Sequence, residues 1–206
     1  MYIPKRFNVK DPEEIFSFLK AHSFATLITT KDGRPVATHI PVIVRQEGEN
    51  LLISGHVAYG NSQWRTWKEV EEALLIFQGP HSYISSSWYA EEQVPTWNYQ
   101  AVHIYGAIRE QTDEELRADL KQLMFTYEQK RDNPVLWETV TPELLEREIK
   151  GIVGFVMKAS EVQAAYKMSQ NRKDHDYANI IEQLKEEPDA GSHQVASEME
   201  RLREKD

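Results

Sequence analysis

The chain has 206 residues and 40% apolar content, which fits one domain, or one domain with appendages, around a real hydrophobic core. It contains no cysteine, and this excludes disulfides, thiolate catalysis and zinc sites with sulfur ligands. A formal net charge of -9 argues against a general nucleic-acid-binding surface, because Lys and Arg supply most of the affinity for phosphates. Neither a secretory signal nor a bilayer-spanning apolar run is evident, so we expect a cytoplasmic protein without membrane association.

Turn and capping signals along the chain predict antiparallel strands with a few helices. Asp11-Pro12 is a cap followed by proline at the first helical position. Asp32-Gly33 supplies the positive backbone angles of a tight hairpin turn, and Thr112 with Glu115 forms a capping box. The expected strands are 24–30, 35–44, 51–57, 73–78, 82–86, 97–110, 152–158 and 163–168. The expected helices are 11–21, 61–72, 112–131, 141–150, 174–187 and 192–205.

About six of these strands precede residue 111, and the two late strands are expected to close a barrel. The fold class that the sequence indicates is therefore a mixed β-barrel with peripheral helices. We expect the barrel domain to span residues 1–185, followed by a charged helical tail over residues 186–206.

Two polar and aromatic stretches, residues 79–89 and 94–106, are the densest chemical signal in the chain. They place rings, hydroxyls and imidazoles on strands where a buried core would carry aliphatic side chains. This composition indicates either a planar ligand with polar edges or a tightly packed contact between subunits.

Four histidines fall in the strand-rich half of the chain, namely His39, His56, His81 and His103. Their separations are long and no carboxylate recurs beside them, so we expect no metal site. They are either hydrogen-bonded barrel histidines, or one or two of them donate to a carbonyl or phosphate of a ligand. No residue can be assigned as a catalytic acid or base.

The chain has neither a Gly-x-Gly-x-x-Gly motif nor a Walker loop, so a bound phosphate would have to be held by side chains. Suitable polar residues form two separated groups that could clasp one ligand such as a flavin. The first group is Ser54, His56, Asn61, Gln63 and Arg65, and the second is Lys167, Ser169, Gln170, Asn171 and Arg172. The competing interpretation of the first group is a loop with a helix cap at Asn61.

Several motifs over about residues 1–185 resemble the PaiB family. They are Met1-Tyr2-Ile3-Pro4, Thr38-His39-Ile40-Pro41, Gly55-His56, Asn61-Ser62-Gln63-Trp64, Phe77-Gln78-Gly79-Pro80-His81, Trp88-Tyr89, Val94-Pro95-Thr96-Trp97-Asn98-Tyr99 and Lys167-Met168-Ser169-Gln170-Asn171-Arg172. That family is described as FMN-binding negative transcriptional regulators, associated in bacilli with repression of sporulation and of degradative enzyme synthesis. The resemblance implies an FMN-binding split β-barrel of the flavin-reductase and pyridoxamine-phosphate-oxidase type, which usually forms homodimers with FMN at the interface.

Together, the resemblance and the polar groups define the residues expected to bind the cofactor. They are His39, Ser54, His56, Asn61, Gln63, Trp64, Ser169, Gln170, Asn171 and Arg172. Two positions depart from the pattern of related sequences. Tyr59 stands where they carry an arginine suited to the FMN phosphate, and this predicts an affinity weakened by about 1.5 to 3 kcal/mol. Ser86 stands where a proline is expected before Ser87-Trp88-Tyr89.

Three functions are consistent with the sequence. The first is an FMN-binding negative regulator of transcription that acts as a homodimer, with promoter DNA or another protein as its partner. The second is an FMN-dependent oxidoreductase of the flavin-reductase type, since a bound flavin can accept hydride. The third is a haem-binding split barrel, because related split barrels include haem-binding members.

Overall fold

The computed structural model describes residues 1–203, which form two compact units. The barrel unit comprises residues 19–77 and 104–162. The terminal unit comprises residues 1–18, residues 78–103 and the chain from residue 163 onward. The predicted division into a domain over residues 1–185 and a tail over residues 186–206 stays a prediction, and residues 204–206 of that tail lie outside the described chain.

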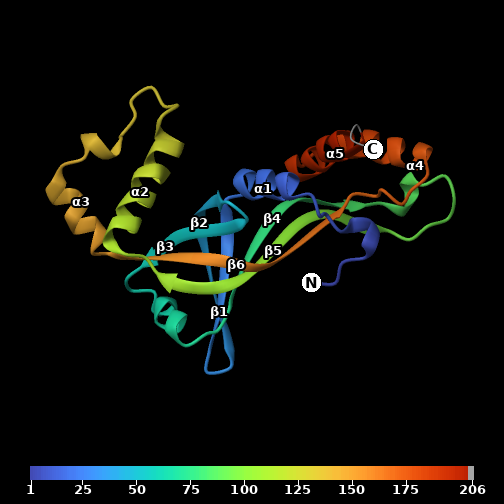
Figure 1. The fold of residues 1–206 in the computed structure, drawn as a ribbon. Helices are drawn as coiled ribbons and strands as arrows, with labels where there is room; N and C mark the ends of the chain where they lie inside the picture. Colours follow the sequence, from blue (N-terminus) through green and yellow to red (C-terminus); the bar gives the residue numbers. More distant parts are fainter. Residues whose placement is uncertain (204–206) are drawn as a thin grey trace. The chain divides into compact units, whose positions relative to one another are not determined.

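Six strands close into a barrel in the order β1-β2-β3-β6-β5-β4, with helices at the periphery (Figure 1). The strands are β1 (Phe24–Lys31), β2 (Arg34–Glu47), β3 (Asn50–Ala58), β4 (Ala73–Ile84), β5 (Thr96–Glu110) and β6 (Ile152–Lys167). The α-helices are α1 (Pro12–Ala21), α2 (Asp113–Glu128), α3 (Pro142–Ile149), α4 (Asp174–Glu186) and α5 (Ala190–Arg203). Short 3-10 helices are η1 (Lys5–Phe7), η2 (Ser62–Lys68), η3 (Ser86–Trp88) and η4 (Trp137–Thr139). The predicted mixed β-barrel with peripheral helices is thereby confirmed.

The local signals act as the sequence predicts. The Glu13 amide donates to Asp11 Oδ1 at 3.0 Å at the start of α1. Asp32 and Gly33 have φ angles of 50° and 76°, which close the β1–β2 hairpin. Both hydrogen bonds of the capping box between Thr112 and Glu115 are present at the start of α2.

Two expected strands, 73–78 and 82–86, are one continuous strand, so five strands rather than six precede residue 111. Gly79 does not break β4, because the Phe18 ring occupies the space that a side chain at this position would need. A Cβ on Gly79 would lie 2.7 Å from Phe18 Cε2. Pro80 costs no hydrogen bond with β1, because the register of β1 with β4 runs only from Leu74 to Ile76.

The late segment is likewise one strand, β6, where we expected a break between residues 158 and 163. The intervening residues contain neither Gly nor Pro, and Ser160 Oγ donates to Glu72 Oε1 at 2.7 Å. The helix expected over 61–72 is the shorter η2, and the helix expected to reach residue 131 ends at Glu128.

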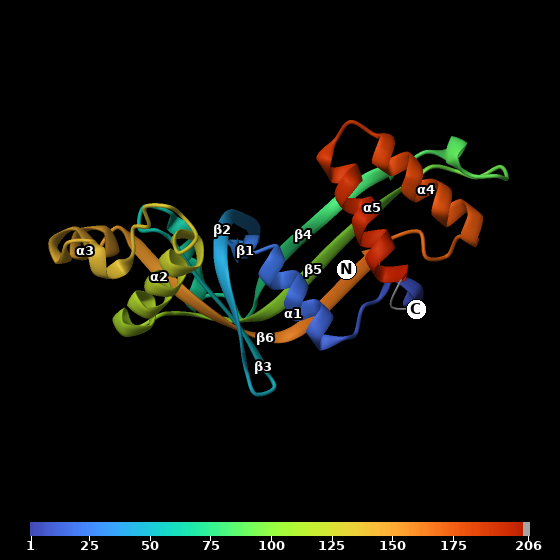
Figure 2. The same cartoon turned by 90° about the horizontal axis from the view of Figure 1, so that it is seen from above.

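Each unit has its own apolar core. In the barrel unit, Leu27, Ile53 and Phe155 are fully buried, and Trp67 meets Phe155 edge to face at 5.4 Å between ring centroids. In the terminal unit, α4 and α5 lie side by side in both views (Figures 1 and 2), and Tyr177 Oη donates to the Met199 carbonyl at 2.7 Å. Within residues 1–203 no helix is both long enough and apolar enough to cross a membrane.

Gly106 of β5 provides a direct test of strand packing in the barrel unit. A Cβ at this position would lie 2.1 Å from the Lys158 carbonyl oxygen of β6, and a backbone atom cannot move aside alone. We therefore expect Gly106→Ala to lower the free energy of unfolding by about 3 kcal/mol, as measured by urea denaturation. Gly60→Ala is the matched control, because nothing lies within 4 Å of its Cβ position, and it should change stability by less than about 0.5 kcal/mol. Equal stability of the two variants would contradict this packing.

Candidate functional site

The pairing of β2 with β3 determines which predicted site residues share a face. Val44 pairs with Ile53, and both are buried in the barrel core. Ile43 pairs with Ser54, so these two side chains point the other way, because side chains alternate along a strand. By the same alternation His39 and His56 also lie on this outer face of the barrel. All three side chains therefore point to the outside of the barrel, Ser54 and His56 from β3 and His39 from the part of β2 that pairs with β1.

Ser54 is nevertheless buried, because a polar network from α2 covers it. Arg45 Nη1 donates to Ser54 Oγ at 2.9 Å, and Arg45 Nη2 forms an ion pair with Asp119 of α2. Gln111 Nε2 donates to the other oxygen of the Asp119 carboxylate. Each charge in the network therefore has a charged or polar partner, as burial of the carboxylate requires.

His56 lies half-buried beside this network. Burial lowers the pKa of His56, and the negative charge of Asp119 opposes that shift more weakly. The imidazole is therefore neutral at pH 7, with one nitrogen as donor and the other as acceptor.

A buried acceptor lies opposite His56. His56 pairs with Gly154 of β6, and a Cβ on Gly154 would lie 2.2 Å from Gln111 Oε1. Within the described residues this Oε1 atom is buried and has no hydrogen-bond partner. Because a buried acceptor without a donor costs free energy, this position favours a donor from outside the chain.

His39 lies at the exposed side of the outer face, on β2. Its Nδ1 is 2.8 Å from Thr26 Oγ1 on β1, and its ring stacks on Phe24 with centroids 6.4 Å apart. The imidazole is therefore held in one orientation while its other edge stays accessible.

Asn61 and Gln63 have a structural role at one end of the barrel. Asn61 Oδ1 accepts from the Gln63 amide at 3.0 Å and so caps η2, as the competing interpretation predicts. The buried Gln63 Nε2 contacts the Leu27 and Val36 carbonyl oxygens, each at 3.1 Å, and its Oε1 accepts from Thr38. These internal partners already occupy both side chains. The expected contact of Asn61 and Gln63 with a cofactor stays a prediction.

The half-buried ring of Trp64 contacts two exposed neighbours, Tyr59 and Arg65. Trp64 Nε1 donates to the Tyr59 carbonyl at 2.9 Å, and the two rings are tilted at 5.6 Å between centroids. The guanidinium of Arg65 lies 4.8 Å from the centre of the Trp64 ring. Within residues 1–203 Arg65 has no ion pair with a carboxylate, so this cation is available to an anionic ligand.

The late motif, residues 169–172, belongs to the terminal unit and forms a tight turn there. Ser169 has a φ of 58° and exchanges hydrogen bonds with the Asn98 amide, at 3.0 and 3.1 Å. Gln170 is bound to the backbone at both ends of its side chain, and Asn171 is exposed. The Arg172 guanidinium lies 4.4 Å from the centre of the Tyr89 ring.

The other two histidines of the four singled out above, His81 and His103, also lie in the terminal unit. His81 Nδ1 is 3.3 Å from Gln78 Nε2, and burial lowers the pKa of His103. Among residues 1–203 no group of three or more His, Asp or Glu side chains is placed to hold a metal ion. Ser85 caps η3, and Ser86 is the first residue of this helix. Proline is also favoured at that position.

Sequence reasoning missed Arg45, Gln111 and Asp119, which surround Ser54 and His56. Arg45 continues the outward alternation of β2 and could have been found from the strand pattern. Asp119 looks like an ordinary helix-surface residue, and only the position of α2 over the outer face gives it this role.

Comparisons with known proteins agree with this fold. The flavocytochrome Anf3 of Azotobacter vinelandii matches with a TM-score of 0.63 and 16% identity, over 86% of this chain and 78% of that chain. The FAD and haem binding protein of Mycobacterium smegmatis matches with a TM-score of 0.58 and 17% identity, over 83% and 78%. The fold is therefore the predicted split β-barrel of flavin proteins.

Sequence comparisons identify the family. Residues 1–161 match the family model described as "Putative FMN-binding domain". The chain is 52% identical to "Protease synthase and sporulation protein PAI 2" of Bacillus subtilis, over 97% of both chains. An uncharacterized protein of Saccharomyces cerevisiae, YKL070W, is 31% identical over 53% of this chain and 78% of its own. The chain belongs to the PaiB family, as the motifs predict.

Ser169 allows a test of the turn in the late motif. Ser169→Ala and Ser169→Gly both remove the hydroxyl bound to Asn98, but only glycine adopts a positive φ without strain. We expect Ser169→Ala to lower the free energy of unfolding by about 1 to 2 kcal/mol and Ser169→Gly to be more stable than it by about 1 kcal/mol, in chemical denaturation. An alanine variant as stable as the glycine variant would contradict the left-handed conformation.

Proposed function

We propose that this protein is an FMN-binding split-barrel regulator that represses transcription, with a role in sporulation and protease production. The family model is described as an FMN-binding domain, and the name of the Bacillus subtilis relative refers to protease synthesis and sporulation. Both descriptions support this proposal. The observation that carries the FMN part is the unpartnered Gln111 Oε1 on the outer face, opposite His56.

The residues of the barrel unit fit the chemical groups of FMN. The pyrimidine edge of a flavin presents an N–H donor, which is the partner that Gln111 Oε1 lacks. Neutral His56 offers a donor or an acceptor to the ligand, and His39 offers its accessible edge. Ser54 orients Arg45 beside them.

The phosphate of FMN needs a cation, and Arg65 supplies one. Its guanidinium is stacked on Trp64 and can meet phosphate oxygens through several N–H donors at once. Asn61 and Gln63 act by holding η2 in place, so that Trp64 and Arg65 are presented in one orientation.

Bound FMN would supply a ring that accepts and releases electrons, through which a regulator could respond to redox state. Ser169, Gln170, Asn171 and Arg172 are proposed as further cofactor contacts on the basis of the family motif alone. The homodimer, the cytoplasmic location and the promoter or protein partner are likewise part of the proposal. The oxidoreductase and haem alternatives stay hypotheses.

FMN binding is tested by quenching of flavin fluorescence on titration with the protein. Tyr59→Arg supplies the cation that the family pattern predicts at this position, so we expect it to bind FMN roughly tenfold to a hundredfold more tightly than the natural chain. Tyr2→Arg is the matched control, because Tyr2 is 88% exposed and belongs to the terminal unit, and it adds the same charge. The proposal fails if no variant binds FMN, or if Tyr59→Arg and Tyr2→Arg bind it equally.

The regulatory part is tested by fluorescence anisotropy with a labelled promoter duplex. Because the net charge is -9, we expect dissociation constants no tighter than about 1 μM at physiological salt, with regulation carried by a protein partner. A tight complex that weakens steeply with added salt would show that the chain contacts DNA directly.

A further inference from the structure

A cavity of about 310 Å³ lies in the terminal unit, beside the part of β4 that belongs to the first aromatic stretch. Its lining consists of three rings, His81, Tyr83 and Trp97, and of the polar residues Ser82, Glu187, Asp189 and Ser192. None of these residues is among those proposed above to contact FMN. The volume is at the lower end of the range for sites that bind small organic molecules.

The three rings stand together in this lining. The centroid of the Trp97 ring lies 6.0 Å from that of Tyr83 and 6.3 Å from that of His81. The planes of Tyr83 and Trp97 meet at 71°, so the two rings form a corner. Tyr83 is 47% exposed and Trp97 is 54% exposed, which leaves much of both side chains open to a ligand. Because the face of an aromatic ring is electron-rich, such rings attract cations.

Two carboxylates, Glu187 and Asp189, line the same cavity, and no Lys or Arg does. Ser192 donates to both oxygens of Asp189, from its amide at 2.9 Å and from its hydroxyl at 2.6 Å. These hydrogen bonds lower the pKa of the Asp189 carboxyl, which is therefore ionised at pH 7. Within residues 1–203 neither carboxylate has an ion pair with Lys or Arg. The lining therefore carries negative charge that the described chain does not neutralise.

The first turn of α5 brings Asp189 close to the strand that carries the rings. Ser192 Oγ is 2.8 Å from the Oγ of Ser82, which stands between the two ring residues of β4. A Cβ on Gly191 would lie 3.2 Å from the His81 carbonyl oxygen and 3.0 Å from Asp189 Oδ1, so these two oxygens are at most 6.2 Å apart. A cation contacts an aromatic ring when it lies within about 6 Å of the ring centre. One small cation can therefore reach the rings and the carboxylate together.

The hydrogen bonding of Asp189 favours a cation without N–H donors. Both of its oxygens already accept from Ser192, so the carboxylate supplies charge more readily than a free acceptor. A quaternary ammonium ion needs no acceptor, because its charge is spread over methyl groups. Those methyl groups also gain contact with aromatic faces, which is the usual mode of recognition for quaternary ammonium ligands.

We propose that this cavity binds a small quaternary ammonium compound. Its trimethylammonium group contacts Tyr83 and Trp97, and the carboxylates of Glu187 and Asp189 balance its charge. The proposal gives a role to the aromatic stretches 79–89 and 94–106, which the FMN site leaves unused. It does not depend on FMN binding, since it uses other residues and is tested on flavin-free protein.

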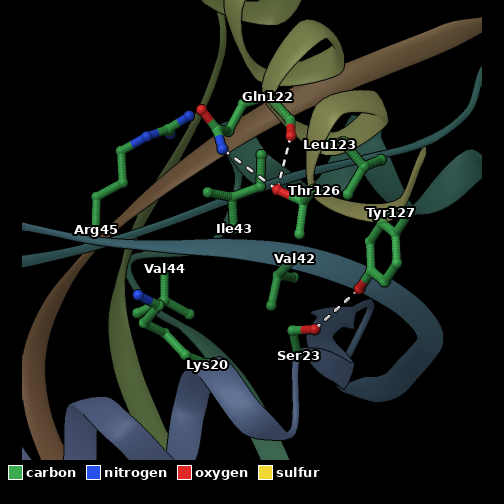
Figure 3. Close-up of a pocket in the computed structure, with 10 residues that line it drawn as sticks. All are labelled: Lys20, Ser23, Val42, Ile43, Val44, Arg45, Gln122, Leu123, Thr126 and Tyr127. Atoms are coloured by element: carbon green, nitrogen blue, oxygen red, sulfur yellow. Dashed lines mark hydrogen bonds between the residues drawn. The ribbon is translucent and has the colours of Figure 1, made fainter. Parts of the chain in front are cut away.

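The test uses choline as the probe and nuclear magnetic resonance of the full-length, ¹⁵N-labelled protein. Choline should shift the amide signals of Tyr83 and Trp97, with a dissociation constant on the order of 1 mM or tighter. The amide signals of Ile43 and Leu123 should not move, because the described lining of their cavity between β2 and α2, drawn in Figure 3, contains Arg45 and no acidic residue.

Two further probes separate charge from shape and from hydrogen bonding. In 3,3-dimethylbutan-1-ol a carbon replaces the nitrogen of choline, so the shape is kept and the charge is lost, and it should bind at least roughly tenfold more weakly. Ethanolamine keeps the charge but lacks the methyl groups, and it should also bind more weakly than choline. The proposal is overturned if choline has no effect, if either analogue binds as tightly, or if the protein binds phosphatidylcholine vesicles but not free choline.

Exposed side chains allow the contacts to be tested without disturbing the core. Tyr83→Leu should weaken choline binding roughly fivefold, because it keeps an apolar side chain but removes the ring. Tyr2→Leu is the matched control, since Tyr2 is 88% exposed in the same unit and outside the lining, and it should bind as the natural chain does.

The charge is tested in the same way at the end of α4. Glu187→Gln should weaken choline binding roughly threefold, whereas Glu186→Gln, at an exposed position outside the lining, should leave it unchanged. Equal dissociation constants for Tyr83→Leu and Tyr2→Leu, or for Glu187→Gln and Glu186→Gln, would contradict a quaternary ammonium site in this cavity.

Discussion

The register between β2 and β3 is the constraint on which the candidate site depends. Because side chains alternate along a strand, a slip of one residue would exchange the core and outer faces of β2. Burial of Val44 against its partner Ile53 opposes such a slip, since a slip of β2 would turn Val44 toward water. The same register brings Ser54 and His56 to the outer face, so the packing of the core determines the chemistry of that face.

Helix α2 then completes the outer face through one ion pair. The Arg45–Asp119 contact ties α2 to β2 and lets Ser54 be buried with its hydrogen bond satisfied. It also places a negative charge near His56, while burial keeps that imidazole neutral. The proposed FMN site therefore depends on the position of α2, through Gln111 and His56.

Short-range signals allowed the sequence to predict much of the fold. The Asp32-Gly33 turn and the Thr112 capping box involve neighbouring residues only, and both were correct. The strand break expected at Gly79-Pro80 is absent, because Gly79 packs against Phe18, which is distant in sequence. Longer-range contacts explain the rest of the site.

Those contacts are invisible to pattern and spacing. Gln63 resembles a ligand-binding amide in the motif, yet its partners include the Leu27 and Val36 carbonyls of the β1–β2 hairpin. Gln111 carries no sequence signal at all, because its position depends on the absence of a side chain at Gly154 of β6. Pairing across strands had to be known before either role could be assigned.

The central claim is that the outer face of the barrel unit is the flavin-binding face. Intermolecular nuclear Overhauser effects between FMN and the protein would test it most directly. The account predicts contacts from flavin protons to the ring protons of His56 and Trp64. Contacts to exposed aromatic rings of the terminal unit, such as Tyr83 and Trp97, with none to His56 would contradict it.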